Sequence, residues 1–157
     1  MTRIKDWELA NLTNEQKEIH DAIVNGPRGH VVGPLRIWLN NPGLAKSAQT
    51  VGAYARYGTS LPQALSELAI LTTGRVWSSE FEWEHHAPLA IEGGIDPKHI
   101  ETISLGKRPL FENQNEQAVF DFAAEANILK NVTDKTYKKL IDILGEDAAI
   151  AVSYTHL

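Results

Sequence analysis

The sequence predicts an all-α protein of about six to eight helices, and three observations support this prediction. Apolar residues recur with helical spacing through most of the chain, and helix-capping signals recur at regular intervals. No segment shows the strict alternation of polar and apolar residues that is typical of a β-strand. Since 157 residues are enough to bury a substantial core, we expect one domain over residues 1–157.

The first half of the chain carries the start signals of several helices. Thr13 and Gln16 form a capping box, in which each side chain accepts a hydrogen bond from the other residue's backbone. Pro34 opens a short apolar segment, Pro42 stands at a helix start, and Ser60 is a typical capping residue. Glycine or asparagine closes most of these segments, so helices are expected over residues 13–24, 42–57 and 60–74.

The second half repeats these signals. Thr133 and either Ser78 or Ser79 are capping residues, and Asp96 followed by Pro97 marks another helix start. Gly145 separates the last two segments. Helices are therefore expected over residues 79–92, 96–106, 116–130, 133–144 and 146–157. The last of them reaches AVSYTHL without a stop signal, which is typical of a truncated end.

Composition excludes several classes of function. The formal net charge of −5 lacks the basic footprint of a nucleic-acid-binding protein. No apolar run is long enough to span a bilayer, and the N-terminal residues lack the apolar core of a secretory signal. We therefore expect a cytoplasmic protein with neither nucleic acid nor membrane as partner. The absence of cysteine excludes disulfides, thiol catalysis and thiolate metal sites.

Residues 65–94 contain the densest group of ionisable and aromatic side chains in the chain. Glu82 and His86 are four residues apart, so on a helix they share a face and are able to hydrogen-bond. Glu67 joins them if its own helix packs antiparallel against theirs. A carboxylate beside an imidazole is a workable proton-transfer pair, whereas the alternative is a surface pair worth about a few tenths of a kcal/mol. His85 points about 100° away from His86 around the helix.

Two segments carry a resemblance to a known family, GPLRIWLNNPGLAKSAQTVGAYARYGTSLPQALSELAIL and SEFEWEHHAPLAIEGGI. Over residues 33–145 the chain resembles the carboxymuconolactone decarboxylase family, which includes the alkylhydroperoxidase D-like proteins. The resemblance implies an alkylhydroperoxidase D-like helical bundle that assembles into a homo-oligomer, a trimer or hexamer. Apolar helix faces that include Val51, Ala55, Leu65 and Leu68 are expected to supply part of the subunit interface.

The redox members of that family carry a glutamate, a C-x-x-C pair and a histidine. In this chain the matching positions are Glu67, Ser79, Glu82 and His86, so both cysteines are missing. Peroxidase chemistry that cycles through a disulfide therefore lacks its nucleophile. A glutamate in place of the second cysteine resembles the decarboxylase side of the family, whose substrate is a small carboxylated lactone from aromatic catabolism.

The resemblance implies a carboxy-lyase that needs no cofactor and in which Glu82, His86 and Glu67 relay a proton. Arg56 is the candidate anchor for the substrate carboxylate, because a guanidinium binds a carboxylate bidentately, and Trp38 is a candidate pocket wall. A structural salt bridge for the arginine and core packing for the tryptophan are the alternatives. No metal is expected, since only half of a di-metal motif is present. The competing functions are a redox-inactive homologue and a hydrolase or isomerase that uses the same Glu–His pair.

Overall fold

The computed structural model describes residues 3–4 and 6–154. These residues form nine α-helices, one 3₁₀ helix and one π-helical turn, and they include no β-strand, which confirms the predicted all-α fold. The chain divides into two compact units, one ending at Gly58 and the other beginning at Thr59. The single domain expected over residues 1–157 stays a prediction.

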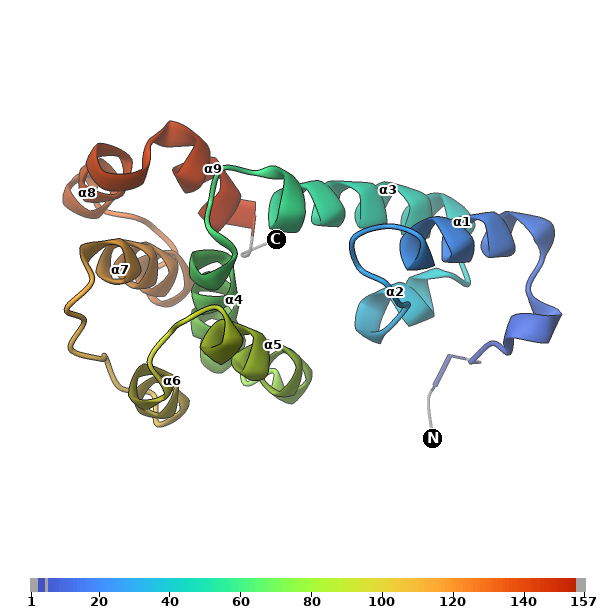
Figure 1. The fold of residues 1–157 in the computed structure, drawn as a ribbon, viewed down its shortest axis with the longest axis horizontal. Helices are drawn as coiled ribbons and strands as arrows, with labels where there is room; N and C mark the ends of the chain where they lie inside the picture. Colours follow the sequence, from blue (N-terminus) through green and yellow to red (C-terminus); the bar gives the residue numbers. More distant parts are fainter. Residues whose placement is uncertain (1–2, 5, 155–157) are drawn as a thin grey trace. The chain divides into compact units, whose positions relative to one another are not determined.

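The first unit contains three α-helices, one 3₁₀ helix and one π-helical turn. In chain order they are η1 (Leu9–Asn11), α1 (Asn14–Val24), α2 (Gly33–Trp38), α3 (Pro42–Ala53) and the π-helical turn η2 (Tyr54–Gly58). The capping box of α1 forms as predicted between Thr13 and Gln16. Within this unit α1 lies beside α3 (Figure 1). Its core consists of Ile19, Ile23, Val31, Leu35, Leu39 and Ala45.

The second unit surrounds one central helix. Its elements are α4 (Gln63–Val76), α5 (Glu80–Glu92), α6 (Pro97–Ser104), α7 (Gln114–Ile128), α8 (Asp134–Leu144) and α9 (Glu146–Tyr154). All five consecutive residues 65–69 of α4 are buried, so this helix is enclosed on every side. Its neighbours are α5, α6, α7 and α9 (Figure 1). Any polar side chain on its middle turns is therefore inside the protein.

Two apolar clusters pack against α4. One lies toward α7, α8 and α9, and its larger members are Leu61, Leu65, Val119, Phe122, Leu140 and Val152. The other lies toward α5, α6 and α7, and its larger members are Leu68, Leu71, Ile95, Ile100, Ile103 and Phe120. Because Leu65 and Leu68 belong to these cores, their expected place in a subunit interface is wrong. Val51, in the first unit, is exposed.

Several predicted helix boundaries differ from the structure for local reasons. The cap of α4 is Pro62 and not Ser60, because proline disfavours helical backbone at the residue before it, Leu61. The helix expected over residues 42–57 ends at Ala53 and gives way to the π-helical turn. The last helix is described as far as Tyr154, so its expected end lies outside the described residues. No helix in the described part of the chain is long and apolar enough to cross a membrane.

Candidate active site

A sharp turn places α5 back against α4. Residues 77–79 form the connection, and Ser78 adopts a left-handed backbone with φ of 54°. The backbone N–H of Ser79 donates to the carbonyl of Gly74 at 2.8 Å, which closes the end of α4. The chain therefore reverses within three residues, and the start of α5 lies beside the end of α4.

Two glycines allow the helices to approach each other closely. A Cβ atom at Gly74 would lie 3.2 Å from the Cβ of Glu82, and one at Gly93 would lie 3.0 Å from the Cβ of Ala64. The first contact is near the start of α5, and the second is just after its end. The absence of a side chain at both positions thus sets the spacing of the antiparallel pair. No local pattern in the sequence indicates this role, because the neighbour of each glycine lies on the other helix.

The close pair brings together the three predicted ionisable residues. His86 Nδ1 lies 2.5 Å from Oε2 of Glu67, and His86 Nε2 lies 3.0 Å from Oε2 of Glu82. Each imidazole nitrogen therefore faces a carboxylate. The side chains of Glu67, His86 and Glu82 are 0%, 7% and 33% exposed, respectively. The series runs from a fully buried carboxylate through the imidazole to a carboxylate that reaches the solvent.

The two contacts of His86 are compatible with two arrangements of protons in the three groups. Each arrangement places one proton between the imidazole and each carboxylate. An imidazolium between two ionised carboxylates satisfies this, and so does a neutral imidazole with one protonated carboxyl group. Both arrangements carry a net charge of −1 and use the same contacts. A proton is thus able to move between Nδ1 of His86 and Glu67 along the hydrogen bond that joins them.

The burial of Glu67 is difficult to explain by stability. A carboxylate in an apolar core loses its hydration. The stabilisation that a compensating ion pair supplies rarely exceeds the stabilisation from a well-packed apolar side chain. Leu68 and Leu71 on the same helix are fully buried, so an apolar side chain is the ordinary occupant of this environment. Buried, paired ionisable groups of this kind gather at functional sites. This favours a functional site over the surface pair considered from the sequence.

Two neighbouring residues behave differently from the triad. The ring of His85 stacks on that of Phe81 with centroids 6.0 Å apart and meets the ring of His86 edge-on at 4.9 Å. Ser79 occupies the N-cap of α5 but makes no capping hydrogen bond through its side chain. His85 thus contacts both Phe81 and the ring of His86, and its expected orientation away from the shared face stays a prediction.

The two predicted substrate-binding residues belong to the first unit. Arg56 lies in the π-helical turn η2, with its guanidinium carbon 5.1 Å from the centroid of the Tyr57 ring. Turns of this kind often accompany functional residues. Trp38 ends α2 and is partly exposed. Since the triad belongs to the second unit, the roles of both residues stay predictions.

Within the described residues, no group of three or more histidine, aspartate or glutamate side chains is arranged to hold a metal ion. In the triad, both ring nitrogens of His86 are already engaged by carboxylates. The chain matches no protein-family model, no curated protein and no solved structure. The resemblance to the carboxymuconolactone decarboxylase family therefore stays a proposal.

Proposed function

We propose that this chain is a cofactor-independent decarboxylase-like enzyme of the carboxymuconolactone decarboxylase family. Its proposed substrate is a small carboxylated lactone or a related acid. The observation that supports this function is the series of Glu82, His86 and Glu67, in which a hydrogen bond joins His86 to the buried Glu67 and an ion-pair contact joins it to the more exposed Glu82. Such a series gives a proton to a substrate at its exposed end, and a proton from solvent then restores its net charge of −1.

Decarboxylation makes two demands on a protein. When the bond between the ring and the carboxylate breaks, CO2 leaves, and the electron pair of that bond moves into the conjugated carbonyl as an enolate. A proton must then reach the carbon atom. In sum, one carboxylate and one proton give CO2 and the decarboxylated lactone. Arg56 is the proposed anchor of the substrate carboxylate, and Trp38 is a proposed wall of the pocket.

We assign the three ionisable residues distinct roles. Glu82 is the most exposed of them and is the acid that protonates the carbon. His86 returns a proton to Glu82 from its Nε2 atom, 3.0 Å away. The buried carboxylate of Glu67 orients the imidazole through Nδ1 and stabilises its charged form. Glu67 is thus a positioning residue, since it acts through His86.

CO2 release tests this proposal. The purified chain is screened against carboxylated lactones and β-keto acids, and CO2 is measured with the wild type, His86→Gln and His85→Gln. We expect turnover with the wild type and a loss of about 10²–10⁴-fold for His86→Gln, the usual contribution of a positioned acid or base. His85→Gln is the matched control, and its loss should be much smaller. Absence of CO2 release from every substrate would contradict the proposal.

An isomerase is the second candidate, because the same proton-sharing geometry also serves proton transfer at a carbon next to a carbonyl. An isomerase would incorporate deuterium from heavy water into the substrate without releasing CO2. A redox-inactive homologue would do neither. Loss of a hydroperoxide in the presence of a dithiol would contradict all three assignments, because the chain has no cysteine to form a disulfide.

A further inference from the structure

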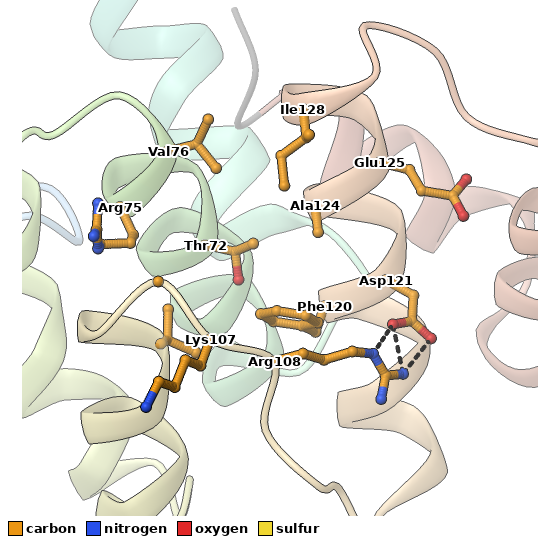
Figure 2. A pocket seen from close by; sticks show the side chains of 12 residues that line it. Thr72, Arg75, Val76, Lys107, Arg108, Phe120, Asp121, Ala124, Glu125 and Ile128 are labelled. Atoms are coloured by element: carbon orange, nitrogen blue, oxygen red, sulfur yellow. Dashed lines mark hydrogen bonds and ion pairs between the residues drawn. The ribbon is translucent and has the colours of Figure 1, made fainter.

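A pocket of about 270 Å³ lies in the second unit. It opens between α4, α7 and the segment that follows α6 (Figure 2). None of the three ionisable residues of the proposed active site lines it. The pocket is therefore a separate feature of this unit, and an inference about its occupant does not depend on the proposed function.

The interior of this pocket is apolar. Val76 from α4 and Ile128 from α7 face each other at one side of the pocket, and the ring of Phe120 lies at the other side (Figure 2). Ile128 is 64% exposed, so a large apolar side chain meets solvent at the opening. The Thr72 hydroxyl donates to the Leu68 carbonyl and is thereby used within α4. An apolar ligand would remove this surface from water without stranding a polar group.

Some of the charged side chains that line the pocket already have partners of opposite charge or hydrogen-bond donors, and others do not. Three cations and two carboxylates line the pocket: Arg75, Lys107, Arg108, Asp121 and Glu125. The guanidinium of Arg108 forms a two-pronged pair with Asp121, at 2.7 and 3.0 Å, shown dashed in Figure 2. Glu125 accepts hydrogen bonds from Thr133 and Thr136 at the start of α8. Both carboxylates thus already have partners, Asp121 within the lining and Glu125 on α8.

Two cations remain for a ligand. The Nε atom of Arg75 donates to the carbonyl of Ser104 at 2.8 Å, which holds the guanidinium at one side of the pocket. Within the described residues, the terminal nitrogens of Arg75 make no hydrogen bond, and Lys107 is exposed and makes no ion pair. Positive charge at the edge of an apolar cavity matches a molecule with one anionic end and an apolar body.

We propose that this pocket binds a medium-chain aliphatic carboxylate, with the carboxylate at Arg75 and Lys107 and the chain against Phe120, Val76 and Ile128. The cavity limits the length of that chain. A cavity of about 270 Å³ therefore suits a chain of medium length.

Titration calorimetry of the full chain with hexanoate, octanoate and decanoate tests the proposal. Each added methylene should tighten binding about three- to four-fold until the pocket is full. Octanol, which has the same length as octanoate but no charge, should bind more weakly than octanoate. Lys107→Gln should weaken octanoate binding about two- to five-fold, the size of an exposed ion pair, whereas Lys138→Gln on α8 should not change it.

A second pair of variants locates the binding site. Ile128→Asp puts a carboxylate at the opening and should weaken octanoate binding at least about ten-fold. Leu129→Asp is the matched control, since Leu129 is the next residue, is similarly exposed and does not line the pocket. Both changes are at exposed positions, and circular dichroism checks that the helices persist. The proposal is overturned if no acid binds, if octanol binds as tightly as octanoate, or if the two aspartate variants behave alike.

Discussion

Gly74 on α4 lies directly against Glu82 on α5, and a Cβ atom at position 74 would stand 3.2 Å from the Cβ of Glu82. At that separation the neighbouring atoms must shift by a few tenths of an ångström. Glu82 is itself paired with His86, which in turn contacts Glu67 in the core. The spacing of the two helices thus controls the position of the proposed acid.

Gly74→Ala should therefore lower turnover of whichever substrate releases CO2 by about ten-fold, because small displacements of a catalytic group are costly. Alanine favours a helix by about 1 kcal/mol over glycine, which offsets part of the steric cost in the free energy of unfolding. Gly43→Ala on α3 is the control, since its Cβ would meet nothing closer than 3.8 Å. Equal turnover of both variants and the wild type would show that this contact does not position Glu82.

The buried pair of Glu67 and His86 should show strong energetic coupling. Glu67→Met leaves the imidazole without its buried partner and should lower the free energy of unfolding by about 3–5 kcal/mol. His86→Leu should do the same to the carboxylate. The double variant places two apolar side chains in the core and should recover most of that loss while it remains inactive. Urea unfolding measures all four proteins, and additive losses in the double variant would contradict the pairing.

Glu125 should make stability depend on pH in acid. Burial alone would raise its pKa, but hydrogen bonds from Thr136 and Thr133, with the charge of Lys135, hold the pKa below its ordinary value of 4.5. A carboxyl group with a lowered pKa in the folded state stabilises the fold above its unfolded-state pKa. That contribution is lost as pH falls below about 4.5 and through the lower folded-state value.

The measurement compares urea midpoints of the wild type and Glu125→Gln between about pH 6 and pH 3. The wild type should be the more stable protein at pH 6, and the difference should shrink as the pH falls. A constant difference across this range would mean that the hydrogen bonds at the start of α8 do not depend on ionised Glu125.

Part of the proposed site could be predicted from the sequence, because it depends on helical spacing. Glu82 and His86 are four residues apart, and their contact follows from the geometry of one helix. The contact with Glu67 depends on how two helices pack. From the sequence it could be predicted only on the condition that the two helices lie antiparallel. The capping box of Thr13 and Gln16 was also predictable, because all of its atoms lie within one turn.

Three features could not be predicted, two because they depend on distant segments and one because it has no local signal. The pocket between α4 and α7 combines residues such as Val76, Arg108 and Ile128, which no local pattern relates. The π-helical turn at Tyr54–Gly58 has no periodic signal that separates it from an ordinary helix end. The close approach at Gly74 likewise involves a neighbour on another helix.

Assembly should involve exposed apolar residues of the first unit. Val51 is 55% exposed and Tyr54 is 68% exposed, and the family resemblance implies a trimer or hexamer. Light scattering on a size-exclusion peak should give a mass three or six times that of the chain. Val51→Glu should lower that mass by placing a charge in the interface, whereas Thr50→Glu, at the neighbouring exposed position, should not. A monomer across micromolar concentrations would contradict the expected assembly.

A proton passes through His86 during turnover in the proposed mechanism, and kcat/KM of His86→Gln measures this step. On the substrate that releases CO2, we expect a fall of about 10²–10⁴-fold for His86→Gln with its helical circular dichroism retained, and a much smaller fall for His85→Gln. Equal losses in the two variants, or no loss in either, would contradict the assignment of the relay to His86.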